Sequence, residues 1–389
     1  MKQGKLIAMG LLTGVVALTS ACGSSDGSSG GAASDDSLSL GVIIDQTGVF
    51  SSTGLPALNG IQLAVDQVNE AGGIDGKEVE LLIEDGTSDP TVAAAVARTL
   101  SRKVPAVIGT SVGAGCRAVQ PILDAAKVFQ YCLSPQQIDH TPLFFSALAP
   151  VADYVPATIP WLKDQGIERI AYIGQNDATG DGYLSVFSYI AQTDPTFEVV
   201  AEERFDSGAT NLETHLTKIR DANPDLIATG TSGANIVPIV RAIKALGMTQ
   251  PVWVGTGSAT IEALSPLASD LPAGGLFANA FWADISAEVP SSVPYAEEVT
   301  SFSEAYSAEY GEPVSSAAGA YDATMQVLEA LKSGAATGEE IAANVESTAF
   351  TGVLGDYAFS PESHQGATLP PVMMTYEGGE TFKLAFAGS

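Results

Sequence analysis

The sequence predicts an α/β protein with two lobes, each a doubly wound parallel sheet, joined by a hinge that the chain crosses several times. Three observations lead to this prediction. The 389 residues exceed what one hydrophobic core usually holds. Short apolar runs alternate with segments of helical periodicity, which is typical of right-handed βαβ units. The alternation restarts after Pro150, which indicates a second lobe built like the first.

The first lobe is expected to contain four strands, each a short apolar run. These strands cover 40–44, 79–83, 104–108 and 128–131. The helix after the first strand ends at Gly72-Gly73. Asp89-Pro90 predicts the start of the next helix, because the carboxylate can accept from free amides and Pro lacks the amide that would have no partner. A third helix is expected over 114–126.

The second lobe repeats this pattern. Strands are expected over 170–173, 197–201, 226–228 and 252–254, with helices over 182–191, 212–222, 236–246 and 261–267. Leu276–Trp282 is a further strand-like run. Two helices, at about 295–310 and 317–332, cannot form a third sheet and are expected to return to the first lobe, with another crossing near 352–359.

These elements define the predicted boundaries. The first lobe comprises 38–148 and 277–353, and the second lobe comprises 149–276 and 354–389. In open α/β sheets, ligands bind outside the carboxyl ends of the strands, so both lobes are expected to offer such an edge to a shared cleft.

The first 37 residues are expected to direct export and to anchor the protein. Two lysines precede an apolar run over 6–18, which has the length of a signal peptide core. Small residues then precede Cys22 and resemble a bacterial lipobox, which implies cleavage after residue 21 and a lipid on Cys22. An ordinary secretory signal with a chance cysteine is the alternative. Residues 22–37 are expected to form a flexible Gly/Ser linker. The signal peptide and the lipid together predict a protein outside the cytoplasm that is attached to the cell membrane.

Charge and cysteine content narrow the possible partners. Lys plus Arg number 17 against 45 Asp plus Glu, so the formal net charge of −28 disfavours nucleic acid and direct contact with an anionic membrane. In an oxidising compartment, the remaining pair Cys116 and Cys132 predicts a disulfide, with two buried free thiols as the alternative. The spacing of cysteines and histidines matches no zinc site, and no nucleotide-binding motif occurs, so no metal and no cofactor are expected.

Two motifs have a catalytic or metal-binding interpretation. Gly109–Gly113 matches G-x-S-x-G between a strand and a helix, so Ser111 with His364 could serve an esterase. The same glycines also suit a turn that opens a helix whose free amides favour an anion. The segment 177–188 resembles a calcium loop but has Ser188 at its twelfth position, so a turn with Asp181 near a helix N-terminus is favoured.

A set of residues lies at fixed spacings along both predicted lobes: Thr47-Gly48, Gly54, Asn59-Gly60, Leu63-Ala64, Asp66, Asn69, Gly72-Gly73-Ile74, Gly76, Asp85, Asp89-Pro90, Val107-Ile108-Gly109 and Gly180-Asp181-Gly182. Together they resemble the leucine/isoleucine/valine-binding type of ABC-transporter solute receptor. The resemblance covers nearly all of 38–389 and implies the type 1 periplasmic binding protein fold. It also implies delivery of a small solute to a permease, with the solute selecting a closed state of the two lobes.

The resemblance also implies where the ligand binds, although several of the family's positions differ here. In the family, one ligand contact follows the Val-Ile-Gly strand, and this position is Gly113 here. A second contact, made by a small residue and a threonine after the next strand, corresponds to Gln136 and Ile138. The aromatic residue of the second lobe corresponds to Thr179, and the acid that pairs with the ligand's ammonium corresponds to Gly257. A buried ammonium without a carboxylate is costly. To bind a standard α-amino acid, the protein would therefore need Asp177, Asp181 or another acid to pair with the ligand's ammonium.

The full set of expected ligand-binding residues combines these positions with polar and aromatic neighbours. They are Phe50, Thr53, Gly113, Ala114, Gln136, Ile138, Thr179, Thr231, Ser232, Gly257, Ser258 and Trp282. For the aromatic pair Phe281-Trp282, hinge packing is the alternative interpretation. The polar residues of this set suit a neutral polar ligand or a carboxylate without an amine.

The expected function is a monomeric, lipid-anchored solute receptor of an ABC importer, and not an enzyme. Its partners are a small molecule, which could be an amino-acid-like compound, an organic acid or an amide, and the transmembrane subunits of a permease. Two alternatives remain open. One is a sensory receptor of the same fold, and the other is a secreted esterase that uses Ser111.

Overall fold

The structure, a computed structural model, describes residues 37–135, 138–139, 141–150, 154–367, 370 and 372–388. The predicted signal peptide, Cys22 and Gln136 lie outside these residues. The two lobes are confirmed as mixed α/β units with separate sheets, whose strand orders are β2-β1-β3-β4-β5 and β14-β13-β10-β9-β8-β6-β7. We call the unit around the five-stranded sheet lobe 1 and the unit around the seven-stranded sheet lobe 2.

Lobe 1 begins with five parallel strands and the helices between them. In chain order these are β1 (Ser37–Ile44), α1 (Ser51–Glu70), β2 (Glu78–Asp85), α2 (Pro90–Leu100), β3 (Ala106–Gly109), α3 (Gly113–Ala126), β4 (Phe129–Cys132) and β5 (Phe144–Ser146). Strand β1 therefore starts at the last residue of the predicted linker. Strand β5 was not predicted, because its three residues, Phe-Phe-Ser, are too few to show a period.

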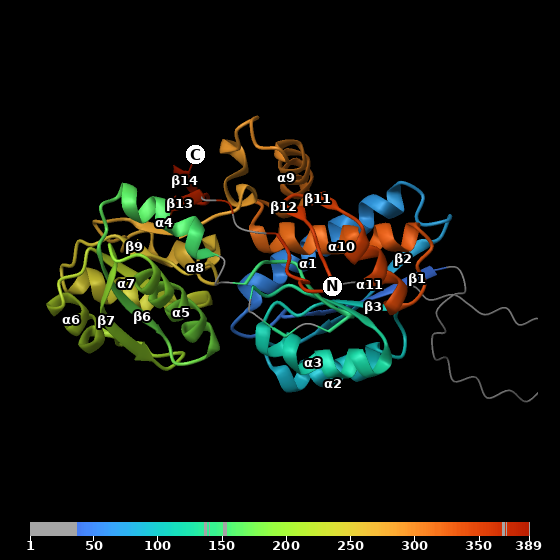
Figure 1. The fold of residues 1–389 in the computed structure, drawn as a ribbon, viewed down its shortest axis with the longest axis horizontal. Helices are drawn as coiled ribbons and strands as arrows, with labels where there is room; N and C mark the ends of the chain where they lie inside the picture. The colour runs from blue at the N-terminus through green and yellow to red at the C-terminus, as the bar shows by residue number, and fades with distance from the viewer. Residues whose placement is uncertain are drawn as a thin grey trace, which may run out of the picture. The chain divides into compact units, whose positions relative to one another are not determined.

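Alternation along β1 explains how the two faces of this sheet are covered. Val42 and Ile44 point into the core on the side of α1, whereas Ile43 packs into the cluster of α2 and α3. Figure 1 shows α2 and α3 on one face, with α1 and α10 (Ser315–Lys332) side by side on the other. Asp89 caps α2 as predicted, because its side chain accepts from the Thr91 amide.

The close contact of α1 with α10 depends on small residues. A Cβ added at Gly60 would lie 2.2 Å from the Ala317 carbonyl oxygen, so only glycine allows this approach. The facing stretch of α10 is Ser-Ser-Ala-Ala-Gly-Ala, and its alanines are fully buried. The prediction that this helix returns to the first lobe is therefore confirmed.

Lobe 2 is the second βα repeat, extended by strands from the end of the chain. Its elements are α4 (Tyr154–Asp164), β6 (Arg169–Gln175), α5 (Ala178–Thr193), β7 (Glu198–Phe205), α6 (Glu213–Asp221), β8 (Leu226–Gly230), η2 (Gly233–Asn235), α7 (Ile236–Ala245), β9 (Val252–Trp253), α8 (Ile261–Leu264), η3 (Ser265–Leu267), β10 (Leu276–Asn279), β13 (Val372–Tyr376) and β14 (Lys383–Ala387). Strands β13 and β14 run antiparallel at one edge.

The remaining segment returns to lobe 1. It consists of η4 (Trp282–Glu288), α9 (Ala296–Tyr310), α10, α11 (Gly338–Ser347) and the hairpin of β11 (Phe350–Gly352) and β12 (Gly355–Tyr357). The hairpin is held by Asp322 of α10, whose buried carboxylate accepts from the Val353 and Leu354 amides and the Tyr357 hydroxyl. No helix in the described ranges combines the length and apolarity needed to cross a membrane.

The predicted crossings need correction. Strand β10 pairs with β9 and β13 in lobe 2, so the chain returns to lobe 1 after Asn279 and not at 276/277. The last crossing lies between Ala367 and Val372 and not at 353/354, because the Ser146 amide of β5 donates to the His364 carbonyl and Leu148 of lobe 1 pairs with Ala367. An apolar run such as Leu276–Trp282 marks a buried strand without showing which sheet it joins.

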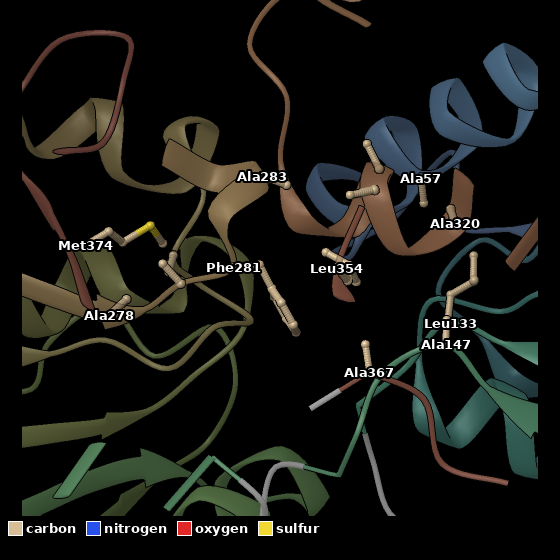
Figure 2. Packing of buried hydrophobic residues seen from close by; sticks show 14 of the residues in the cluster. Ala57, Leu133, Ala147, Ala278, Phe281, Ala283, Ala320, Leu354, Ala367 and Met374 are labelled. Atoms are coloured by element: carbon tan, nitrogen blue, oxygen red, sulfur yellow. The ribbon is translucent and has the colours of Figure 1, made fainter. Parts of the chain in front are cut away.

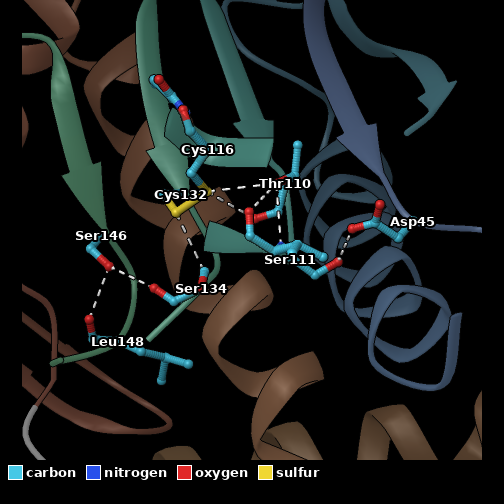
Figure 3. The surroundings of a disulfide bond; sticks show 10 residues. Asp45, Thr110, Ser111, Cys116, Cys132, Ser134, Ser146 and Leu148 are labelled. Carbon is cyan, nitrogen blue, oxygen red and sulfur yellow. Dashed lines mark hydrogen bonds between the residues drawn. A yellow bond between two sulfur atoms is a disulfide. The ribbon is translucent and has the colours of Figure 1, made fainter. Parts of the chain in front are cut away.

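The predicted disulfide is present and joins α3 to β4 (Figure 3). Cys116 and Cys132 are both fully buried and pack with Ile138 and Phe144. The bond links the start of the helix that follows β3 to the end of the neighbouring strand. It thus fixes the two carboxyl-terminal strand ends that carry the lobe 1 side of the site described next.

Candidate functional site

The main cleft is a pocket lined by residues of both lobes. Its lining consists of Phe50, Thr53, Ser111, Val112, Gly113, Leu133, Ser134, Pro135, Leu148, Val314, Ser315 and Ser316 from lobe 1, of Thr179, Tyr183, Ser232, Thr256, Gly257, Ala259, Thr260, Asn279 and Met374 from lobe 2, and of Phe281 and Asp284 from the crossing segment. The space measures about 980 Å³ with its open mouth included. Residues after β3, β4, β8 and β9 meet there, at carboxyl ends of strands as predicted.

The lobe 1 wall presents backbone amides at the start of α3. The N-cap residue Val112 makes no side-chain cap, so the amides of Gly113, Ala114 and Gly115 begin the helix without an intrahelical acceptor. The Thr110 hydroxyl is engaged with the Val112 carbonyl. The positive end of the helix dipole therefore faces the cleft at Gly113, which favours a negatively charged group there.

The lobe 2 wall is a network of hydroxyl groups around Tyr183. The Tyr183 hydroxyl lies 2.8 Å from Thr256 Oγ1 and accepts from the Gly257 amide at 3.1 Å. Gln175 Oε1 accepts from both the amide and the hydroxyl of Ser232. Burial raises the pKa of Tyr183, so its ring contributes a neutral polar surface. These contacts fix the orientation of the side chains in this wall.

A second layer of hydrogen bonds supports this wall from behind. Thr231 and Ser258 are fully buried, and their hydroxyl oxygens lie 2.9 Å apart. The Ser258 hydroxyl also donates to the Gly233 carbonyl. Because the two side chains satisfy each other and lie outside the cleft lining, the structure places them behind the site.

Asp284 is the one carboxylate among the described residues that line the main cleft. Its Oδ2 accepts from the Phe281 amide at 3.0 Å and its Oδ1 accepts from the Ser315 amide at 2.6 Å. Burial raises the pKa of Asp284 to about 6, because the charged form loses solvent while the hydrogen bonds from the Ser315 amide, the Phe281 amide and the Ser315 side chain compensate only in part. The lining contains no lysine, arginine or histidine among the described residues.

Asn279 adds a buried amide at the end of β10. Its Oδ1 accepts from Thr158 Oγ1 and from Trp253 Nε1, which fixes the orientation of the side chain. Its Nδ2 has no hydrogen-bond partner among the described residues, although the residue is only 1% exposed. A buried donor without a partner is costly, so this group favours an acceptor at the adjoining cleft.

A side pocket adjoins the main cleft and shares four of its residues. The shared residues are Phe50, Val112, Gly113 and Thr179, and the side pocket adds Asp45, Arg117 and Asp177. Asp45 Oδ2 accepts from the Ser111 hydroxyl at 3.0 Å, and burial raises the pKa of Asp45 (Figure 3).

Six of the predicted ligand-binding residues line the main cleft. They are Phe50, Thr53, Gly113, Thr179, Ser232 and Gly257. Ala114 lines only the side pocket. Contact of any of these residues with a ligand stays a prediction, because lining alone does not establish binding.

Four predicted residues lie elsewhere. Thr231 and Ser258 lie behind the wall, and Ile138 packs against the disulfide. Trp282 is buried outside the lining, whereas its neighbour Phe281 lies in it. Figure 2 shows the Phe281 ring projecting from the segment after β10, with Met374 nearby. Phe281 has extended backbone dihedral angles and Trp282 begins a helical segment, so the two neighbouring side chains take different directions and only Phe281 reaches the cleft.

The acids considered for an ammonium are also placed elsewhere. Asp177 caps α5 by accepting from the Thr179 and Gly180 amides, and it lines the side pocket only. Asp181 pairs with Arg204. Sequence reasoning missed Asp284 and Tyr183 because neither falls on a motif. The expected aromatic position holds Thr179, and Tyr183 supplies the ring one helical turn later.

The esterase arrangement is not assembled in this geometry. The Ser111 hydroxyl donates to Asp45, so a carboxylate occupies the position of a general base. His364 stacks on Phe145, and its Nδ1 lies 2.9 Å from the Phe144 carbonyl oxygen. The two residues of the proposed pair thus have different partners, and Ser111 serves as part of the cleft wall.

Comparison with known proteins gives one family. The periplasmic binding protein family matches residues 37–380. An amino acid binding protein of Pseudomonas aeruginosa is 24% identical over 237 residues, which are 57% of this chain and 61% of that protein. The chain therefore matches less than two thirds of the length of this relative.

Solved structures share the fold over nearly their whole length. The branched-chain amino acid transporter substrate binding protein LivJ of Streptococcus pneumoniae, in complex with isoleucine, is 23% identical with a TM-score of 0.76, over 90% of this chain and 98% of that chain. The leucine binding protein LivK of Thermotoga maritima is 24% identical with a TM-score of 0.75, over 90% and 98%. At these identities the likeness shows the fold alone.

Proposed function

Because the chain belongs to the periplasmic binding protein family, a family of solute-binding proteins, we propose that it is the solute receptor of an ABC importer. It captures a small solute in the main cleft, closes around it and delivers it to the transmembrane subunits of a permease. Residues 1–21 direct export, and Cys22 carries the lipid that holds the receptor at the outer face of the cell membrane.

One observation carries this proposal. Strand ends of two separate sheets contribute to one cleft, so a solute in contact with both walls stabilises the arrangement in which the walls approach. The amides at Gly113 offer a site for a carboxylate on the lobe 1 wall. The relatives named above as amino acid binding proteins support a solute of amino-acid size.

A thermal-shift screen of amino acids, carboxylates, amides and polyols tests the proposal with purified protein from residue 23 onward. A solute at 100 times its Kd stabilises the folded state by about 2.7 kcal/mol. Small-angle scattering with that solute should show a smaller radius of gyration. An unchanged radius at saturating solute would refute closure of the lobes.

A matched pair of substitutions on α5 locates the binding site. Thr179→Trp places a large ring at the cleft lining, whereas Thr193→Trp places the same ring at the exposed end of the helix. We expect the first variant to lose the thermal shift and the second to keep it. Equal shifts in both variants would show that the solute binds outside the main cleft.

A further inference from the structure

The loop between β1 and α1 brings the backbones of the two lobes together at one edge of the main cleft. Gly233, in η2 of lobe 2, lies so close to lobe 1 that an added Cβ would stand 2.9 Å from the Val49 carbonyl oxygen and 3.9 Å from Ser52 Oγ. The neighbours Phe50 and Ser232 line the main cleft. Gly233 also has a φ of +53°, a left-handed conformation that other residues disfavour. Glycine at this position therefore permits a close approach of the lobes that a side chain would obstruct.

Hydrogen bonds hold the lobe 1 side of this contact in one conformation. The Asp85 carboxylate accepts from both the amide and the hydroxyl of Thr47. The Ser88 hydroxyl accepts from the Phe50 amide at 3.1 Å and donates to the Thr47 carbonyl at 3.1 Å. We call residues 47–50 the tongue. Because its partners lie at the end of β2 and just after it, the tongue is fixed to lobe 1.

Hydrogen bonds also fix the surface of lobe 2 that meets the tongue. The Gly233 amide donates to the Gly257 carbonyl at 2.8 Å, and the Gly233 carbonyl accepts from Ser258 Oγ at 2.9 Å. Ser258 in turn pairs with Thr231 behind the cleft wall. This buried pair therefore holds Gly233 in the place where lobe 1 approaches it.

Val49 gives the tongue an exposed apolar side chain. Its exposed fraction, 66%, is the highest of the large apolar side chains among the described residues. Val49 lines a groove whose other lining residues all belong to lobe 2, and the apolar ones are Ala209, Ala234, Val237, Pro238 and Pro266. With its open mouth included, the groove measures about 1130 Å³. An apolar side chain of lobe 1 thus stands at an apolar groove of lobe 2 and is only partly buried there.

We propose that the tongue is a latch between the lobes: Val49 enters the groove of lobe 2 as the lobes close, and this contact stabilises the closed state. The proposal rests on the proposed function, because a latch requires lobes that open and close around a solute. Phe50, the next residue, lines the main cleft, so one rigid loop adjoins both the cleft and the groove. Full burial of a valine side chain shifts an equilibrium by roughly 10-fold, and the 66% of Val49 that is still exposed corresponds to about 5-fold.

A pair of cysteines tests the contact without any solute. Val49→Cys and Ala234→Cys are introduced together into the protein from residue 23 onward, and mass analysis of the oxidised protein counts its disulfides. A disulfide requires Cα atoms within about 7 Å of each other, so we expect a second bond beside the native one. Ile83→Cys with Ala234→Cys is the matched control and should give no second bond, because Ile83 is an exposed aliphatic residue on β2 of lobe 1. A 49–234 pair that stays reduced, or that bonds no faster than the control pair, overturns the latch.

Two glycine substitutions test whether the lobes approach each other at Gly233 in solution. Gly233→Ala adds a Cβ that meets the Val49 carbonyl, whereas Gly247→Ala adds one at a similar φ of +63° with nothing beyond its chain neighbours within 4 Å. Nitroxide labels at Arg102→Cys of lobe 1 and Arg220→Cys of lobe 2, both exposed positions, report the distance between the lobes. We expect a longer mean distance for Gly233→Ala alone. Equal distances in the two variants would show that the lobes do not meet there, which overturns the proposal.

The same labels measure what the Val49 side chain contributes. We expect Val49→Asn to lower the ratio of closed to open molecules by about 5-fold and Val49→Ile to maintain it. Neither change should alter the thermal unfolding midpoint, because the site is exposed. An unchanged ratio in Val49→Asn overturns the latch and leaves the receptor function to the thermal-shift screen. Absence of any solute-induced thermal shift removes the proposed function and leaves the cross-link between the lobes in place, so the two failures are distinguishable.

Discussion

Asp322 makes the stability of lobe 1 dependent on pH, and the size of the effect follows from its surroundings. The carboxylate is fully buried between α10 and the β11–β12 hairpin. Burial raises its pKa from 3.8 to about 7, against the lowering effect of the Leu354 and Val353 amides and the Tyr357 hydroxyl. The titratable groups that face it are tyrosines 131, 321 and 357 and the carboxylate of Glu298 on α9.

The sign of the dependence follows from the raised pKa. Between pH 3.8 and about 7 the folded state holds a proton on Asp322 that the unfolded chain has released, so stability falls as pH rises through this window. About two pKa units separate pH 5 from the folded-state pKa, at ~1.4 kcal/mol each. Asp322 therefore lowers the free energy of unfolding by about 3 kcal/mol between pH 5 and pH 8.

The variant Asp322→Asn removes this titration and tests the prediction. Urea unfolding of both proteins at pH 5 and pH 8 gives the difference in their free energies of unfolding at each pH. Between pH 5 and pH 8, we expect the free energy of unfolding of the unmodified protein to fall by about 3 kcal/mol relative to that of the variant. Other buried acids, such as Asp45 and Asp284, titrate in both proteins and cancel.

Asp356→Asn, an exposed change on the same hairpin, serves as the control. It should leave the pH dependence as it is in the unmodified protein. A difference between the unmodified protein and Asp322→Asn that stays constant from pH 5 to pH 8 would show that burial does not perturb this carboxylate.

Three further predictions concern covalent bonds and packing. Replacing Cys116 and Cys132 by serine should lower the free energy of unfolding by about 3 kcal/mol, since the bond closes a loop with a sequence separation of 16; two alkylatable thiols in the native protein would contradict it. Gly60→Ala should lower the free energy of unfolding in urea by about 1–3 kcal/mol, because the added Cβ meets the Ala317 carbonyl. Ala320→Gly on the facing helix adds no atom, so it should lower the free energy of unfolding by less than Gly60→Ala does. Cys22→Ala should block lipid attachment and leave the precursor uncleaved, which mass analysis of membrane fractions shows; normal processing of that variant would rule out a lipobox.

Sequence patterns predicted the parts of the fold that depend on local regularity. The strands and helices from β1 to α3 and from β6 to α7 have strong periodicity, and Asp89-Pro90 marked the start of α2 correctly. Strand β5 and the β11–β12 hairpin escaped prediction because three residues do not establish a period. The sheet that β10 joins is set by its pairing with β9 and with β13, the latter almost a hundred residues later, and no local pattern contains these contacts.

The sequence predicted the location of the candidate site and several residues of its lining, but not its carboxylate, Asp284. The family resemblance pointed to Gly113 and Gly257, and both line the main cleft in turns that follow strands, where ligands of open α/β sheets bind. Asp284 follows no strand directly and lies in an irregular helical segment whose path is set by its return to lobe 1. Its half-buried position and its hydrogen bonds arise only when the Phe281 and Ser315 amides meet it, which no local sequence pattern contains.

The antiparallel edge of lobe 2 has a consequence for the order of events during synthesis. Strands β13 and β14 come from the last 18 residues of the chain, although the helices made just before them belong to the other lobe. The sheet that begins at Arg169 thus gains its final two strands only when residue 387 has emerged. Neither half can be finished from a single continuous stretch, so a nascent chain cut short before this point leaves β10 as an open edge able to pair with another molecule.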